Sequence, residues 1–162
     1  MKKSQWYIGT PSGVVLCVDH VESRNSQFTA RVYHGYSTQA VYIEGVSQLL
    51  FELERFYDSI NFPHLSTNER TFQDKVPNTY CKEERAKIMS DEELLRKHGD
   101  LGTFIIRVQH RQNSSWQGKI TWMDKDKTIY FRSVWEMIKL IAGALDTVSD
   151  EGDSSQSITW EE

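Results

Sequence analysis

The sequence predicts an α+β fold in which two duplicated βββα units form one pseudo-two-fold domain, with a mainly antiparallel sheet and packed helices. The first observation is that residues 14–58 align with residues 102–146 without a gap, apolar over apolar, at an offset of 88 positions. The second is that each copy holds three runs with strand-like alternation, and the third is that each copy closes with helical spacing. Because one three-stranded sheet leaves edges and a face uncovered, we expect the two copies to complete each other.

The first copy contains a strand, a hairpin and a helix. Residues 14–18 alternate as a strand does, and residues 28–34 and 40–43 predict a hairpin. Over residues 46–60, apolar side chains recur at three- and four-residue spacing, which predicts an amphipathic helix. Asn61-Phe62-Pro63 predicts the end of this helix.

The second copy repeats this order. Alternating apolar residues predict strands over residues 104–111, 116–122 and 128–132. Around the turn between the last two strands, we expect Trp122 to lie opposite Ile129.

A helix follows these strands. Ser133 and Glu136 have the spacing of a capping box, in which the serine accepts from an orphan amide and the glutamate reaches back. Apolar residues then recur from Val134 to Leu145, which predicts a helix with one buried stripe.

We expect residues 1–146 to form a single domain, in which a loop and helix over residues 61–99 join the repeats. Within this connection residues 82–98 predict a surface helix, and Trp6-Tyr7-Ile8 predicts an extra edge strand. Residues 147–162 hold five acidic and no basic side chains and lack periodicity, so they predict an acidic, disordered tail.

The composition favours a cytoplasmic protein. The net charge of -4 comes from the acidic tail, because the rest of the chain is nearly balanced. No apolar run is long enough to cross a bilayer, and no secretory signal is readable at the start. Because no apolar run can cross a bilayer, we expect no membrane association. Cys17 and Cys81 give no disulfide framework, so we expect reduced thiols.

Motifs for catalysis and nucleotide binding are missing from the sequence. It contains no glycine-rich phosphate loop, no HExxH and no GxSxG. Five histidines are scattered without the spacing of metal ligands, at His20, His34, His64, His98 and His110. The sequence therefore predicts no cofactor and no metal, and an enzyme is the less favoured class.

Polar positions of the second copy predict a basic sheet face. If Ile120 pairs with Phe131, then Lys119 lies opposite Arg132, and like charges directly across a ladder are unfavourable. Such a face suggests an anionic partner such as phosphate, nucleic acid or an acidic peptide. The ligand-binding candidates are Arg107, Arg111, Asn113, Lys119, Tyr130 and Arg132.

The first copy lacks this accumulation of positive charge. If Val32 pairs with Ile43, then Arg31 lies opposite Glu44, which is a complementary pair. The alternative for the second copy is a solvated face on which Glu136 neutralises Arg132 one turn into the helix.

Two short patterns adjoin in residues 107–118. RxxxR, at Arg107 and Arg111, and NxSxxG, at Asn113, Ser115 and Gly118, resemble the cyclic-di-GMP-binding motifs of PilZ domains. The resemblance implies that the arginines grip phosphates and that the Asn/Ser element contacts guanine. In PilZ domains a strand separates the two motifs, whereas one residue separates them here.

These patterns favour a small non-enzymatic binding or regulatory protein, a monomer or homodimer, whose basic sheet face engages an anionic or protein partner. The alternative is a single-stranded nucleic-acid-binding module, because the duplicated units resemble PUR-type sheet platforms in element order. A cyclic-dinucleotide binder of the PilZ type and an unrecognised enzyme rank below these two. Trp135 falls off the apolar stripe of its helix, so it either anchors a partner or packs against the other unit.

Overall fold

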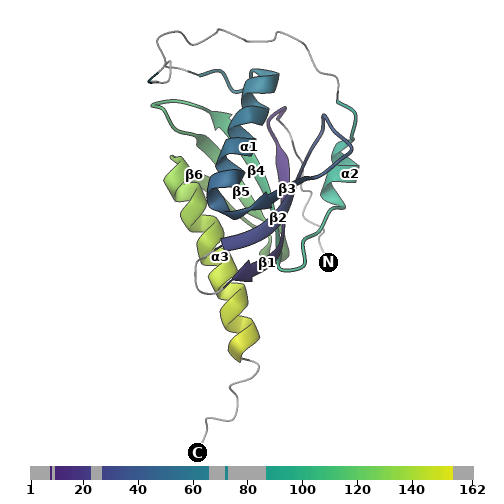
Figure 1. Cartoon of the computed structure of the whole chain (residues 1–162), viewed down its shortest axis with the longest axis vertical. Coiled ribbons are helices and arrows are strands. Elements are labelled where there is room, and N and C mark those ends of the chain that lie inside the picture. Colours follow the sequence, from purple (N-terminus) through teal and green to yellow (C-terminus); the bar gives the residue numbers. More distant parts are fainter. Residues whose placement is uncertain (1–7, 9, 23–26, 66–71, 73–86, 155–162) are drawn as a thin grey trace, which may run out of the picture.

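Figure 1 shows the protein as a computed structural model, which describes residues 8, 10–22, 27–65, 72 and 87–154. In chain order the elements are β1 (Val14–Glu22), β2 (Gln27–His34), β3 (Val41–Glu44), α1 (Gly45–Ile60), α2 (Asp91–Leu95), β4 (Gly102–His110), β5 (Gln117–Trp122), the 3-10 turn η1 (Met123–Lys125), β6 (Lys127–Phe131) and α3 (Val134–Ser154). The predicted α+β class with an antiparallel sheet and packed helices is confirmed.

The six strands form one sheet in the order β3-β2-β1-β4-β5-β6, and every neighbouring pair is antiparallel. β1 and β4 meet at the centre, where Val15 pairs with Ile105 and Leu16 with Phe104. Helices α1 and α3 lie on the same side of this sheet (Figure 1). We call that side the helix face and the opposite side the outer face.

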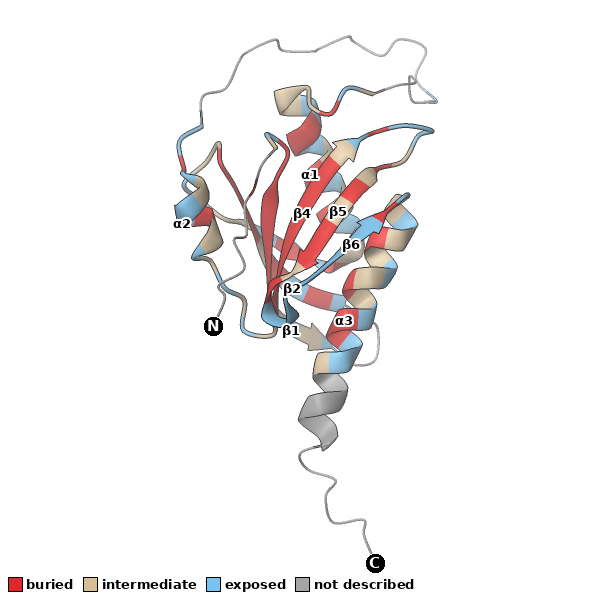
Figure 2. Cartoon of the chain, turned by 180° about the vertical axis from the view of Figure 1, so that it is seen from behind, coloured by how far each residue is buried: buried red, intermediate tan, exposed pale blue. Residues whose placement is uncertain are grey.

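Both faces of the sheet carry a hydrophobic core, as the alternation of side chains in β1 and β4 requires. On the helix face, Leu16 and Phe104 pack with Leu49 and Leu53 of α1 and Met137 of α3. A smaller core on the outer face is formed by Ile8, Val15, Cys17, Tyr33, Met89, Leu94, Ile105 and Met123. Figure 2 shows the outer face, with buried residues along β4 and β5 and an exposed β6.

Local sequence explains where the helices begin and end. The Ser133 hydroxyl accepts from the backbone N–H of Glu136 at 3.2 Å, as the capping pattern predicts. The Glu136 carboxylate accepts from the backbone N–H of Arg132 at 3.2 Å. Helix α1 ends before Asn61, which has the left-handed φ of 50° that asparagine tolerates, so its predicted end is confirmed.

The predicted registers of both hairpins are wrong by two residues. Val32 lies opposite Val41 rather than Ile43, and Arg31 lies opposite Tyr42 rather than Glu44. The connection between these strands is therefore two residues shorter than predicted, since the partner of Val32 lies two positions earlier in the chain.

In the second hairpin, Ile120 lies opposite Ile129, and Lys119 opposite Tyr130 rather than Arg132. Trp122 lies opposite Lys127, because the turn η1 and Asp126, with φ of 51°, close the hairpin over only a few residues. A shift of two residues leaves each side chain on its expected face, since the side-chain period of a strand is two.

Each central strand contains one β-bulge that the alternation did not predict. The register shifts between Val18 and His20 in β1, and between Val108 and His110 in β4. One extra residue reverses the faces of the side chains that follow it. Arg107 and Arg111 therefore do not share a face, contrary to the prediction.

The connection and the tail also differ from expectation. Within the predicted helix at residues 82–98, residues 82–86 lie outside the described residues, and the helix that is present is only Asp91–Leu95. Helix α3 continues to Ser154, so the first eight residues of the predicted tail, 147–154, are helical. Trp6 and Tyr7 of the expected edge strand also lie outside the described residues. Across the described ranges, no helix has the length and apolarity to cross a membrane.

Candidate functional site

Three of the six predicted site residues lie in one row across the outer face. Arg107 on β4 pairs with Lys119 on β5, which pairs with Tyr130 on β6. The Lys119 ammonium lies 5.0 Å from the centre of the Tyr130 ring, within the range of a cation–π contact. Tyr130 is 66% exposed, so this end of the row faces solvent. We call Arg107, Lys119 and Tyr130 the cationic row.

Arg107 is the buried end of the cationic row, with only 7% of its surface exposed. Its Nη2 donates to the hydroxyl of Thr121 at 2.8 Å, and that hydroxyl lies 2.8 Å from the hydroxyl of Thr128. These side chains fix the guanidinium against β5. Arg107 is therefore held in place within the sheet, while Lys119 and Tyr130 are the more accessible members of the row.

The first half of the molecule has a comparable row, but its charge is neutralised. Arg31 on β2 lies opposite Tyr42, which is 74% exposed, and opposite Cys17 on β1. Its Nε and Nη2 donate to the two carboxylate oxygens of Asp19 at 2.8 and 3.0 Å. This hydrogen bonding lowers the pKa of Asp19.

The bulges show why the two rows differ in charge. Asp19 is the bulged residue of β1, and Gln109 is the bulged residue of β4. An amide therefore occupies the place of the carboxylate in the second half. Among the described residues, Lys119 forms no ion pair with a carboxylate. The two rows thus differ in one respect: Arg31 pairs with a carboxylate at the bulge beside it, whereas the residue at the matching bulge beside Lys119 is uncharged.

Arg111 lies on the helix face, where it is 1% exposed. Its Nη1 donates to Glu54 at 3.3 Å and to Asp58 at 2.8 Å, and its Nε donates to the Pro63 carbonyl at 2.6 Å. Glu54 also accepts from Trp116 Nε1 at 2.9 Å. We call Arg111, Glu54, Asp58 and Trp116 the ionic cluster. It joins the end of β4 to α1 and places Arg111 away from the cationic row.

The remaining predicted residues lie in other places. Arg132 is exposed after β6, and its Nε donates to Glu136 at 2.9 Å, as the solvated-face alternative expected. Asn113 is in the β4–β5 loop with φ of 55°. The Ser115 hydroxyl accepts from the backbone N–H of Val134 at 2.9 Å. The five residues that carry the PilZ-like motifs therefore do not converge on one site.

Sequence reasoning missed a groove on the helix face. It has a volume of about 250 Å³ and is lined by Val21, Phe28, Val46, Leu49, Trp135, Ile138, Lys139, Ile141, Ala142, Leu145 and Asp146. The signal for it was present, because Trp135, Ile138, Ala142 and Leu145 recur at helical spacing beside the buried stripe of α3. We call this space the α1–α3 groove.

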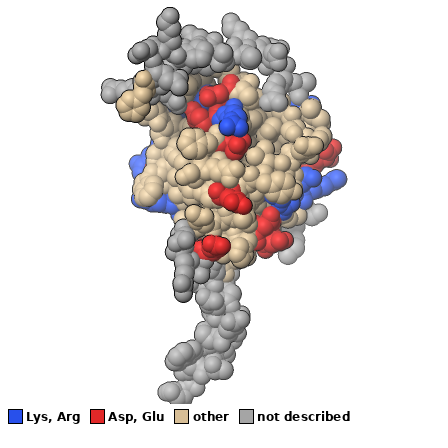
Figure 3. All heavy atoms as spheres, viewed as in Figure 1, with Lys and Arg blue, Asp and Glu red and all other residues tan. Residues whose placement is uncertain are grey.

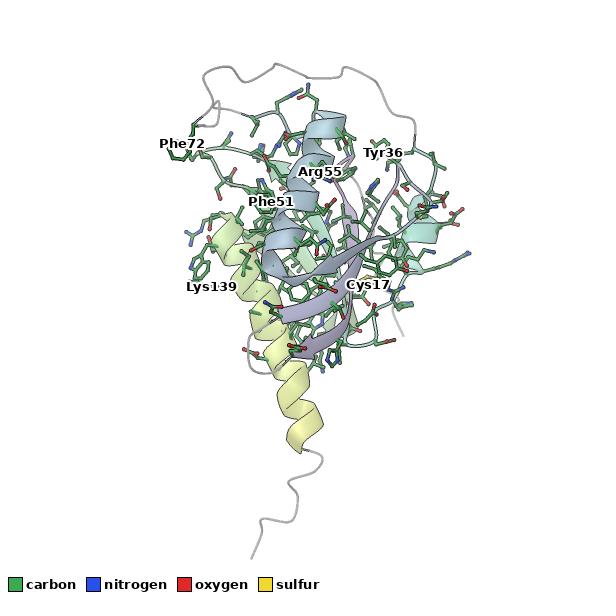
Figure 4. The ribbon with its side chains drawn as sticks, viewed as in Figure 1. Cys17, Tyr36, Phe51, Arg55, Phe72 and Lys139 are labelled. Atoms are coloured by element: carbon green, nitrogen blue, oxygen red, sulfur yellow. The ribbon has the colours of Figure 1, made fainter. Side chains whose placement is uncertain are left out.

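A second space on the helix face lies between α1 and the β2–β3 hairpin. It has a volume of about 190 Å³, and its lining includes His34, Glu52, Arg55, Phe56 and Ser59. The His34 ring stacks on Phe56 with centroids 4.1 Å apart. Figure 4 shows Arg55 on α1, on the side where Tyr36 of the hairpin lies.

In the ranges that the structure describes, no three His, Cys, Asp or Glu side chains come together in a way that could hold a metal ion. Burial raises the pKa of the Cys17 thiol to about 11, so this sulfur is protonated at neutral pH and is a poor nucleophile.

Comparison with known proteins finds no matching family model, no similar curated protein and no similar solved structure.

Proposed function

We propose that this is a small non-catalytic binding protein whose cationic row engages an acidic segment of a partner protein. The observation that carries the proposal is the difference between the two rows of the outer face. Asp19 neutralises Arg31 in the first half, whereas Gln109 stands at the corresponding bulge in the second half. The second half would therefore keep a positive potential, which attracts an acidic segment.

The accessible part of the row suits a carboxylate-bearing partner. Lys119 supplies the charge, and Tyr130 offers an exposed ring with a hydroxyl that can both donate and accept. Arg107 adds potential from below without being displaced from Thr121. Because charged rim contacts act mainly through steering and specificity, we expect binding that weakens with salt.

We also propose that the fold arose by duplication of a βββα unit. The β2–β3 and β5–β6 ladders have equivalent registers at an offset of 88 residues, since Val32 opposite Val41 matches Ile120 opposite Ile129. The bulges of β1 and β4 match at an offset of 90 residues. Both facts support two related halves, with two residues fewer between the first and second strands of the later copy. We place the protein in the cytoplasm, as its sequence predicts.

A fluorescein-labelled oligoglutamate peptide tests the proposed function by anisotropy at low salt. Lys119→Glu should weaken binding about tenfold, because it replaces an attractive charge with a repulsive one. Lys127→Glu is the matched control: it makes the same charge change on the neighbouring strand, but Lys127 lines the helix face beside Trp122. Equal losses in both variants, or no binding by the native protein, would contradict the proposal.

Single-stranded nucleic acid is a second candidate partner, favoured by one observation. Tyr42 and Tyr130 are both strongly exposed on the outer face, and each lies across a ladder from a cation, Arg31 or Lys119. Aromatic rings beside cations are the elements that stack and hold single strands. A labelled oligothymidylate should then bind more tightly than the oligoglutamate peptide, and both Tyr130→Ala and raised salt should weaken it.

A further inference from the structure

We infer that the α1–α3 groove is a docking site for one amphipathic helix of another protein. This surface lies on the opposite side of the sheet from the cationic row, so it is independent of the proposed function. Nine of the eleven side chains that line the groove are apolar. Lys139 and Asp146 supply its charges, and their placement defines which helix fits.

The shape of the groove follows from the elements that enclose it. One wall is α3 from Trp135 to Asp146, which spans about 16 Å, or three helical turns. The opposite wall is the first turn of α1, with Val46 and Leu49. Val21 of β1 and Phe28 of β2 form the floor. The α3 wall, three turns long, matches the length of one short helix laid along it.

The groove presents apolar surface to solvent. Trp135 is 63% exposed, although a tryptophan ring gains much from burial. Phe51 of α1 is also exposed, and Figure 4 shows it on the same face as Lys139 of α3. In Figure 3 uncharged residues form much of this face, with charged side chains among them. Exposed apolar side chains beside a groove are typical of protein–protein contact sites.

The two charges of the groove select the direction of the docked helix. The Lys139 ammonium lies 5.2 Å from the centre of the Trp135 ring, at the start of the groove, and Asp146 lies seven residues further along α3. A complementary helix carries an acidic residue near Lys139 and a basic residue two turns later near Asp146. Acids in the first turn and bases in the last turn also stabilise the helix that carries them. The favoured helix therefore runs parallel to α3.

Two labelled synthetic peptides of about 15 residues test this inference, because a helix of that length covers the groove. Both carry the same leucine stripe, but one has glutamate in its first turn and lysine in its last turn, and the other has glutamine at both places. Anisotropy should show that the first peptide binds about tenfold more tightly than the second. In Lys139→Glu this preference should disappear, because one charge of the peptide then meets a like charge in either direction. Lys139 is exposed, so the variant should fold.

Matched variants separate the groove from other surfaces. Trp135→Ala should weaken the preferred peptide about tenfold, because it removes the exposed ring that borders the groove. Tyr42→Ala, which removes an equally exposed ring from β3, should leave the affinity unchanged, as should Lys119→Glu. Failure of the oligoglutamate test would therefore leave these results intact.

Three results would overturn the inference. The first is that neither peptide binds, and the second is that both bind the native protein equally well. The third is that sedimentation shows a dimer of the native protein that Trp135→Ala converts to a monomer, because a second copy would then be the occupant of the groove.

Discussion

The two halves of this molecule, residues 14–60 and 102–154, share an order of strands and helix but differ in the side chains at matching places. On the outer face, Asp19 neutralises Arg31 in the first half, whereas the matching bulge of the second half carries Gln109. The bulge of β1 places a carboxylate beside the cation of the next strand, and the bulge of β4 has no carboxylate to offer Lys119. The residue at each bulge thus decides whether the cation of the next strand has an acidic neighbour there.

The helix face shows a second difference between the halves. The space beside α1 has a volume of about 190 Å³ and includes His34, Glu52 and Phe56, whereas the space between α3 and β6 has about 40 Å³ and includes Trp122, Leu140 and Ala144. These residues match in pairs at an offset of 88. Trp122 fills the space that the smaller His34 leaves open. The sheet fixes where side chains lie, and their volume decides whether a hollow remains.

The largest expected effect comes from breaking the contact between the halves. Arg111→Ala should lower the free energy of unfolding by about 3 kcal/mol, because it removes a buried cation that Glu54, Asp58 and the Pro63 carbonyl all contact. Urea unfolding measures the loss. Arg132→Ala is the control, since Arg132 is exposed and its pair with Glu136 is in solvent, so no loss of stability is expected. Equal stabilities of the two variants would contradict the role of the ionic cluster.

A glycine at the β4–β5 ladder offers a smaller test that contrasts matching positions. A Cβ added at Gly118 would collide with the carbonyl oxygen of Arg107, whereas the matching position in β2 is Ala30. Gly118→Ala should therefore cost about 2 kcal/mol by overpacking. Ala30→Gly should cost about 1 kcal/mol, mainly through chain entropy. Thermal unfolding of both variants compares them, and a harmless Gly118→Ala would show that the two ladders have the same spacing.

The smallest expected effect concerns pH. Hydrogen bonding to Arg31 lowers the pKa of Asp19 below its ordinary value of 3.8. A lowered pKa in the folded state stabilises the protein above the unfolded value, and this stability is lost as the pH falls through the folded value. In Asp19→Asn, the melting temperature should therefore fall less steeply between neutral and acid pH than in the native protein. Gln109→Asn, at the matching bulge, should leave the acid dependence unchanged.

The faces of the strands were readable from the sequence, but the exact ladder partners were not. Both hairpin registers were wrong by two residues, yet Ile120, Trp122 and Lys119 lie on their predicted faces. Alternation has a period of two, so it cannot distinguish registers that differ by two residues. Turn geometry decides between them, and the left-handed conformation of Asp126 at the second turn left no clear mark in the sequence.

The candidate site was only partly predictable for a related reason. The cationic row follows from alternation, but Arg111 does not join it, because the bulge at Gln109 shifts the chain by one residue. A shift of one residue reverses the faces, and nothing in the pattern Val108-Gln109-His110-Arg111 marks the place. The α1–α3 groove was missed because hydrophobic periodicity tells which residues are apolar, not how far apart two helices lie.

The pairing of β1 with β4 at the centre of the sheet also bears on how fast the protein folds. Each outer hairpin joins neighbouring stretches of chain, so it can form early and locally. The central ladder joins Val15 to Ile105, about 90 residues away, and closing so long a loop carries a large entropic cost before any contact compensates it. We therefore expect the rate-limiting step of folding to be the encounter of the two preformed hairpins.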